Sequence, residues 1–201
     1  MTKLSKMAIT KAIEFYEHDH HRRYDILFST DDLRWFRRAA VMIPLFENDD
    51  DWYVLLTQRS NALDEHRGQV AFPGGAKEEK DENLQWTALR EMHEEIGLEP
   101  QDAQIFGYLG DIPIITKYIV RMFVGQIPWP YPLKISEDEV ESVFTVPLRW
   151  LADPAHHTIR YRSIAGREFP VIYFDYFDGH QLWGASAEMT LALLTALRPI
   201  L

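Results

Sequence analysis

The 201-residue chain contains no cysteine, and this absence excludes disulfide bonds and metal sites built on thiolates. It also lacks any apolar run of roughly 20 residues, the length that a membrane-spanning helix needs. Its N-terminal stretch has no continuous apolar core of the kind found in signal peptides. We therefore expect a soluble, cytoplasmic protein without a membrane partner.

Basic residues are in the minority, with 21 Lys and Arg against 31 Asp and Glu, so the formal net charge is −10. Such a surface disfavours nonspecific binding of nucleic acid, and we expect no nucleic-acid partner. A phosphorylated small molecule remains compatible with this charge if divalent cations lie between the carboxylates and the phosphates. The hydrophobic fraction of 46% is enough for one well-packed core.

Hydrophobic periodicity predicts a mixed α/β order without a regular βαβ repeat, which favours a mixed sheet with helices on both faces. A short helix at 31–38 is expected to start at Asp31 or Asp32. Residues 1–30 are expected to form a helical extension of a domain over residues 31–201. Strands are predicted at 39–46, 52–59, 68–75, 104–115, 118–127, 139–146, 158–162 and 170–177, and further helices at 4–17, 82–97, 147–153 and 185–201.

The helix predicted at 82–97 concentrates carboxylates next to its apolar stripe. The stripe repeats every fourth residue and consists of Leu84, Ala88, Met92 and Ile96. Glu91 and Glu95 stack one turn apart beside it, and Glu94 flanks the same face. Partly buried carboxylates are costly unless a cation compensates them. Oxygen ligands favour Mg²⁺ or Mn²⁺ over Zn²⁺, whereas the alternative interpretation is a solvated acidic helix face.

The segment FPGG precedes this helix and predicts a loop in which a ligand can approach the backbone. Gly74 and Gly75 supply the conformational freedom, and Asp81, Glu82 and Asn83 offer N-terminal caps for the helix. A strand, a glycine loop and a carboxylate-lined helix together make a compact site for a metal and an anion.

Residues 74–98 resemble the Nudix box, usually written G-x5-E-x7-R-E-U-x-E-E-x-G-U with U apolar. The matching positions are Glu82, Arg90, Glu91, Met92, Glu94, Glu95, Gly97 and Leu98. Gly75 lies one residue too early, so the loop is one residue longer than the general pattern. The resemblance implies a Nudix-type α/β/α sandwich with a mixed β-sheet, over residues 31–201, and metal-dependent hydrolysis of a pyrophosphate linkage.

Residues 55–75 are similar to a second motif, L-L-T-x-R-S-x3-R-x3-G-x-V-x-F-P-G-G, of Nudix enzymes that hydrolyse coenzyme A. The matches are Leu55, Leu56, Thr57, Arg59, Ser60, Gly68, Val70, Phe72, Pro73, Gly74 and Gly75. Asp64 stands where the motif has its middle arginine, and Arg67 would substitute from one turn away if the segment were helical. This resemblance implies that coenzyme A or a derivative is cleaved to adenosine 3′,5′-bisphosphate and 4′-phosphopantetheine.

The resemblance also implies roles for individual side chains. Glu91 and Glu95 are expected to bind Mg²⁺ or Mn²⁺ directly, and Glu94 directly or through water. A general base is expected among these three or at Glu139. The alternative interpretation of Glu139 is a plain surface glutamate. Arg90 is expected to pair with a carboxylate such as Glu82. The residues expected to bind substrate are Arg59, Arg67, Gly74 and Gly75.

Two other functions remain open at this point. Asp64 favours a different substrate, such as ADP-ribose, NADH or another nucleoside diphosphate conjugate. A non-catalytic Nudix regulator is the second alternative, but such proteins normally lack box glutamates that are present here. The expected partner is a small nucleotide-containing molecule, and a homodimer is compatible with the chain.

Overall fold

The computed structural model describes residues 4–16, 28–61, 67–164 and 167–201. Within these ranges the α-helices are α1 (Lys6–Glu14), α2 (Thr30–Leu33), α3 (Leu84–Ile96), α4 (Leu148–Ala152) and α5 (Gly184–Leu197). The strands are β1 (Arg37–Asn48), β2 (Asp51–Arg59), β3 (Val70–Ala71), β4 (Gly74–Ala76), β5 (Gln104–Ile114), β6 (Tyr118–Gln126), β7 (Val140–Pro147), β8 (His157–Ile164), β9 (Arg167–Phe177) and β10 (His180–Trp183).

A mixed sheet of seven strands forms the centre of the fold. Its main order is β3-β2-β1-β6-β5, with β4 paired to β1 and β7 paired to β2. β1 runs parallel to β6 and antiparallel to β2. The β1–β2 hairpin turns at Asp49 and Asp50, which both take positive φ angles. The predicted mixed sheet is therefore confirmed.

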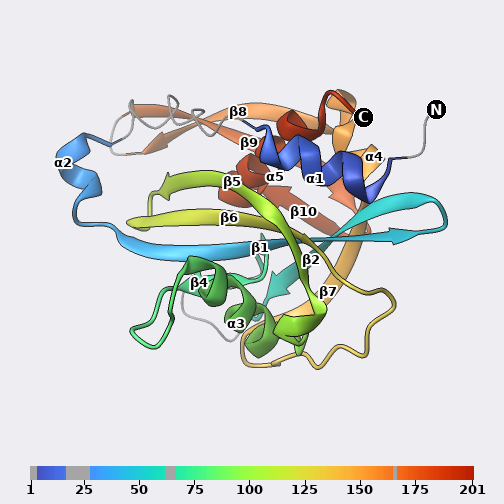
Figure 1. Ribbon diagram of the computed structural model, residues 1–201. Coiled ribbons are helices and arrows are strands. Elements are labelled where there is room, and N and C mark those ends of the chain that lie inside the picture. Colours follow the sequence, from blue (N-terminus) through green and yellow to red (C-terminus); the bar gives the residue numbers. More distant parts are fainter. Residues whose placement is uncertain (1–3, 17–27, 62–66, 165–166) are drawn as a thin grey trace.

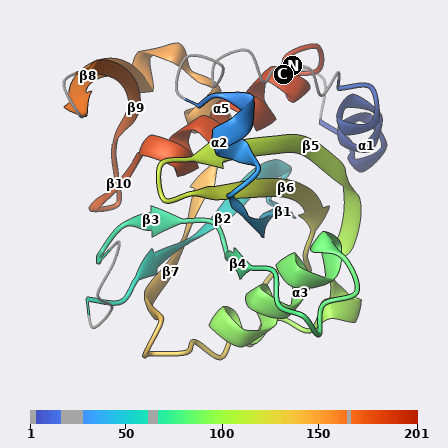
Figure 2. The same cartoon turned by 90° about the vertical axis from the view of Figure 1, so that its left-hand side faces the viewer.

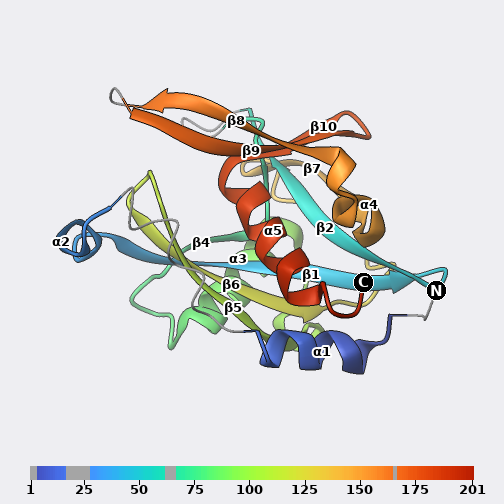
Figure 3. The ribbon, with the colours of Figure 1, turned by 90° about the horizontal axis from the view of Figure 1, so that it is seen from above.

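Helices cover both faces of this sheet, which confirms the predicted α/β/α sandwich (Figure 1). On one face, Ala88, Met92 and Ile96 of α3 are fully buried against a core that includes Met42 and Leu55. The opposite face carries α1 and α5, and α5 extends from the second sheet toward α1 (Figure 3). The stripe predicted on the helix at 82–97 thus faces the core.

The C-terminal strands form a separate antiparallel sheet of order β10-β9-β8, away from α3 (Figure 2). The sequence predicted two of these strands and did not separate them from the main sheet. It missed β10, because four residues are too short for a periodic signal. Instead of extending the main sheet, this second sheet packs on α5.

The helix ends follow local capping chemistry. Asn83 caps α3 by accepting a hydrogen bond from Trp86 N at 2.9 Å, and Gly97 ends it in a left-handed conformation, φ 71°. The predicted start of the short helix at Asp31 or Asp32 is wrong, because Ser29 is its N-cap and Asp32 completes a capping box.

The N-terminal helix α1 joins the main core through Ile9 and Ile13, both buried. The division of the chain at residue 30 stays a prediction, since residues 17–27 lie outside the described ranges. Among the residues that the structure describes, no helix has the combination of length and apolar character needed to cross a bilayer.

Candidate active site

The carboxylates of Glu91, Glu95 and Glu139 converge at one point of the molecule. Oxygen atoms of the three side chains lie within 4.8 Å of one another. Glu91 and Glu95 come from successive turns of α3, whereas Glu139 lies in the turn before β7. We call these three residues the glutamate cluster. The structure thus joins Glu139 to two glutamates more than forty positions earlier in the sequence.

Backbone hydrogen bonds hold the turn with Glu139 against α3 and β2. Ser136 N donates to the main-chain oxygen of Glu95 at 2.9 Å, and Glu139 N donates to Ser136 O at 3.0 Å. Ser60 N, just beyond β2, donates to Glu139 O at 2.9 Å. These bonds fix the main chain of the turn, so the position of Glu139 in the cluster follows from the fold.

Burial raises the pKa values of two carboxyl groups of the cluster, those of Glu95 and Glu91. Glu95 is 2% exposed, and burial raises its pKa to about 8, although the charge of Arg59 opposes this rise. Arg59 Nη1 lies 3.9 Å from Glu95 Oε1, and Gly74 N–H also donates to this carboxylate. Burial likewise raises the pKa of Glu91, although the charge of Arg90 and its hydrogen bond oppose this rise, and the charges of Glu94 and Glu139 add to it. Without a further cation, Glu91 and Glu95 resist ionisation.

The donor set of the cluster fits a divalent cation. Glu95 Oε2 is buried and accepts no hydrogen bond from the residues that the structure describes. A buried, unpartnered carboxylate oxygen among like charges is costly, and a cation removes this cost. The converging ligands are all carboxylate oxygens, the type that Mg²⁺ and Mn²⁺ bind. The glutamate cluster therefore fits a divalent cation.

The two glycines of FPGG allow close approaches that a side chain would block. A Cβ atom on Gly75 would lie 2.5 Å from the carboxyl carbon and Oε1 of Glu91. A Cβ atom on Gly74, whose φ is 158°, would lie 2.4 Å from the main-chain oxygen of Ala40. Gly75 therefore allows Glu91 to approach the loop, and Gly74 allows β4 to pair with β1.

Arg90 pairs with Asp81, and the expected pairing with Glu82 is wrong. Its Nε and Nη2 donate to the two carboxylate oxygens of Asp81 at 2.8 and 3.0 Å. Nη2 also donates to Ala76 O at 3.2 Å, which ties the loop to α3. The hydrogen bonds from Arg90 lower the pKa of Asp81 far below its usual range, while Glu82 is exposed. The sequence did contain a signal for Asp81, because it lies six positions after Gly75, the spacing between the glycine and the acid in the Nudix box.

Glu94 does not join the glutamate cluster. Its side chain is 44% exposed and accepts a 2.7 Å hydrogen bond from Arg90 Nη1. Lys80 Nζ lies 3.7 Å from its other oxygen. In the structure Glu94 therefore lies beside the cluster and binds Arg90.

The two arginines that are expected to bind substrate phosphates, Arg59 and Arg67, lie in different surroundings. Arg59 ends β2, is 28% exposed at its side chain and lies beside Glu95. Its Nε atom is buried without a hydrogen-bond partner among the described residues. Arg67 is exposed and follows the segment 62–66, so the idea that it replaces the arginine missing at Asp64 lies outside the described residues.

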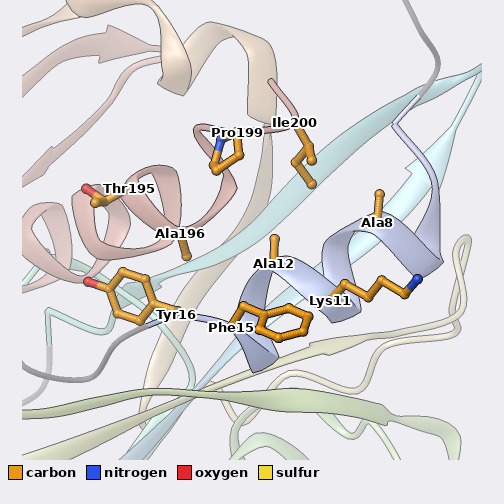
Figure 4. A pocket seen from close by; sticks show the side chains of 9 residues that line it. All are labelled: Ala8, Lys11, Ala12, Phe15, Tyr16, Thr195, Ala196, Pro199 and Ile200. Carbon is orange, nitrogen blue, oxygen red and sulfur yellow. The ribbon is translucent and has the colours of Figure 1, made fainter.

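A pocket elsewhere on the molecule is separate from this site. It lies between α1 and the C-terminal end of α5, on the face of the sheet opposite α3, and Ala12, Phe15, Ala196 and Pro199 contribute to its lining (Figure 4). Its lining contains none of the carboxylates discussed above. We therefore assign it no part in the chemistry of the glutamate cluster.

Residues 35–188 of the chain match the family model of the NUDIX domain. The chain belongs to the Nudix hydrolase family. The Nudix hydrolase NudL of Escherichia coli strain SMS-3-5, itself described as uncharacterized, is 40% identical over 147 residues, which are 73% of this chain and 70% of that protein. Membership makes the chain a pyrophosphate hydrolase and leaves its substrate open.

Solved structures support the Nudix fold. A MutT/nudix family protein from Enterococcus faecalis matches with a TM-score of 0.53 and 15% identity, over 98% of this chain and 74% of that one. RenU, a Nudix hydrolase from M. smegmatis, matches with a TM-score of 0.51 and 16% identity, over 82% and 88% of the two chains.

Proposed function

We propose that this Nudix hydrolase cleaves the pyrophosphate bond of coenzyme A or its derivatives, giving adenosine 3′,5′-bisphosphate and 4′-phosphopantetheine. The observation that supports it most is that the 55–75 motif and the glutamate cluster meet in space. Arg59, from the start of that motif, lies 3.9 Å from Glu95, and Gly75, from its end, lies against Glu91. Both parts of the motif therefore contact the residues that would carry the chemistry.

The cluster residues would hold the cations. Glu91, Glu95 and Glu139 are proposed as ligands of Mg²⁺ or Mn²⁺, and Glu94 is proposed to act through its contact with Arg90. A divalent cation held there would neutralise charge on the diphosphate and lower the pKa of a bound water. A carboxylate of the cluster that is ionised when the metal is bound would accept the proton that the water loses.

Arginines would orient the substrate. Arg59 presents a planar guanidinium at the edge of the cluster, the geometry that binds phosphate oxygens in a bidentate manner. Arg67 is proposed as a second contact, and the extra 3′-phosphate of coenzyme A provides an anion for it. Gly74 and Gly75 are proposed to let the diphosphate approach the main chain.

A substrate panel tests the proposal. Purified protein with Mg²⁺ or Mn²⁺ is incubated with coenzyme A, dephospho-coenzyme A, ADP-ribose and NADH, and the products are separated by chromatography. We expect the highest kcat/KM for coenzyme A, with adenosine 3′,5′-bisphosphate as a product. Because a charge-assisted hydrogen bond contributes about 1.5 to 3 kcal/mol, dephospho-coenzyme A should be cleaved at least about tenfold less efficiently.

The Glu95→Gln variant is the control for contaminating activity. Cleavage of ADP-ribose or NADH with a kcat/KM equal to or above that of coenzyme A would refute the substrate assignment. A wild-type protein that cleaves no diphosphate in the presence of metal would refute the enzymatic role.

A further inference from the structure

We propose that Asp81, and not Glu82, is the residue that positions Glu91 and the glycine loop, by acting through Arg90. The proposal rests on the metal-dependent function above and assigns a further residue to that site. It also predicts that Glu82, the position that matches the Nudix box, is dispensable.

Asp81 has the contacts of a fixed anchor. It is 3% exposed, and its carboxylate accepts four hydrogen bonds. Two come from Arg90, one from Glu78 N at 2.9 Å and one from Thr87 Oγ1 at 3.0 Å. A carboxylate with this many donors has one allowed orientation, so it fixes the plane of the guanidinium that it binds.

Arg90, held in this orientation by Asp81, contacts Glu91 and Glu94. With Nε and Nη2 bound to Asp81, Nη1 is directed to Glu91 Oε1 at 2.9 Å and to Glu94 Oε2 at 2.7 Å. The guanidinium therefore contacts Glu91 through one nitrogen only. If Asp81 lost its charge, the fork of Arg90 would be free to pair with Glu91 through two nitrogens and draw it from the cluster. Asp81 thus keeps Glu91 available to a cation.

The length of the loop explains the shift in position. Asp81 lies six residues after Gly75, and eight residues separate it from Arg90. Glu82 is exposed, and within the described part of the chain it forms none of the ion pairs around Arg90. The additional residue of the loop therefore lies between the acid and Arg90, and the acid that pairs with Arg90 moves one position upstream.

The test compares Asp81→Asn with the matched control Glu82→Gln. The first readout is Mn²⁺ affinity by calorimetry, without substrate and well below the melting temperature of each variant. The second is the NMR signal of the Arg90 Nε–Hε group, whose hydrogen exchanges slowly when it is bound to a buried carboxylate. The third is kcat/KM on whichever diphosphate the wild type cleaves.

We expect Asp81→Asn to lose about 10- to 100-fold in Mn²⁺ affinity and kcat/KM, the range seen when residues supporting metal ligands are changed, and to lose the protected Arg90 signal. Glu82→Gln should stay within about twofold of the wild type in all three readouts, since it removes no contact to Arg90. If Asp81→Asn does not fold, Thr87→Ala replaces it, because it removes one donor to Asp81 and keeps the charge. It should then weaken Mn²⁺ binding more than Glu82→Gln does.

Three results would overturn the proposal. The first is a loss in Glu82→Gln as large as that in Asp81→Asn. The second is an Asp81→Asn protein with a lower melting temperature but unchanged Mn²⁺ affinity, which would make Asp81 a structural residue only. The third is a protected Arg90 signal that survives in Asp81→Asn. A wild-type protein without Mn²⁺ affinity contradicts the proposed function instead, and the Arg90 signal still decides between Asp81 and Glu82.

Discussion

Replacement of Glu95 by glutamine should remove a pH dependence of stability from the metal-free protein. The folded-state pKa of Glu95 is about 8, above the ordinary value of 4.5, because the carboxylate is buried. In the metal-free wild type, the stability that depends on Glu95 is therefore fully present below about pH 4.5 and is lost as the pH rises through 8. A glutamine is neutral throughout this range, so the variant lacks this loss.

The magnitude follows from the shift. One pKa unit corresponds to about 1.36 kcal/mol, so the raised pKa of Glu95 lowers the stability of the metal-free fold by about 3 kcal/mol at pH 7 and by about 4 to 5 kcal/mol above pH 8. Between pH 5 and pH 9, the stability of Glu95→Gln relative to wild type should rise by about 4 kcal/mol. Burying the glutamine amide of the variant also costs free energy, but this cost is the same at every pH. It therefore does not affect how the stability difference between variant and wild type changes with pH.

Urea unfolding with EDTA, at pH 5, 6, 7, 8 and 9, measures this difference. An exposed glutamate, Glu79, provides the control, and Glu79→Gln should leave the pH dependence of the wild type unchanged. Mn²⁺ at about 100 times its Kd should stabilise wild type by about 2.7 kcal/mol and stabilise Glu95→Gln much less. A stability difference that stays flat from pH 5 to pH 9 would refute the conclusion that Glu95 is a buried, uncompensated acid.

Further predictions concern activity and proton release. Glu95→Gln should lower kcat by about 10² to 10⁴, the contribution of a general base, with an unchanged circular dichroism spectrum, and normal turnover would contradict its role. Gly75→Ala should fold, because the clash falls on the end of the Glu91 side chain, yet weaken Mn²⁺ binding about 10-fold or more in calorimetry. Binding of Mn²⁺ should release about one proton at pH 7 and close to none at pH 9, as read from calorimetry in buffers of different ionisation enthalpy. Arg59→Ala should raise KM for coenzyme A more than it lowers kcat, and a pure kcat effect would argue against phosphate binding by Arg59.

Local patterns were enough to predict most of the elements. The stripe of α3 repeats over three turns, and the apolar runs of β1 and β2 are separated by an acidic turn. Such signals depend only on neighbours in sequence, and the structure confirms them. The same stripe predicted that Glu91 and Glu95 point to the edge of the core, and both are at least partly buried.

Other features depend on tertiary contacts that no local pattern contains. Main-chain hydrogen bonds to Ser60 and Ser136 place Glu139 beside Glu95. Because these bonds are tertiary contacts, the sequence around Glu139 could not distinguish it from an ordinary surface glutamate. Glu82 was expected to pair with Arg90 because it matches the spacing of the Nudix box. In the structure, the buried side chain of Asp81 accepts the hydrogen bond from Arg90 instead. The separate C-terminal sheet follows from packing on α5, which periodicity does not encode.

Calorimetric titration of Mg²⁺ and Mn²⁺ into the wild type, with and without a nonhydrolysable diphosphate analogue, tests the central claim most directly. The claim is that Glu91, Glu95 and Glu139 form a divalent-cation site that acts on a diphosphate. We predict saturable metal uptake that tightens with the analogue and is lost in the Glu95→Gln variant. Absence of uptake by the wild type under both conditions would contradict the account.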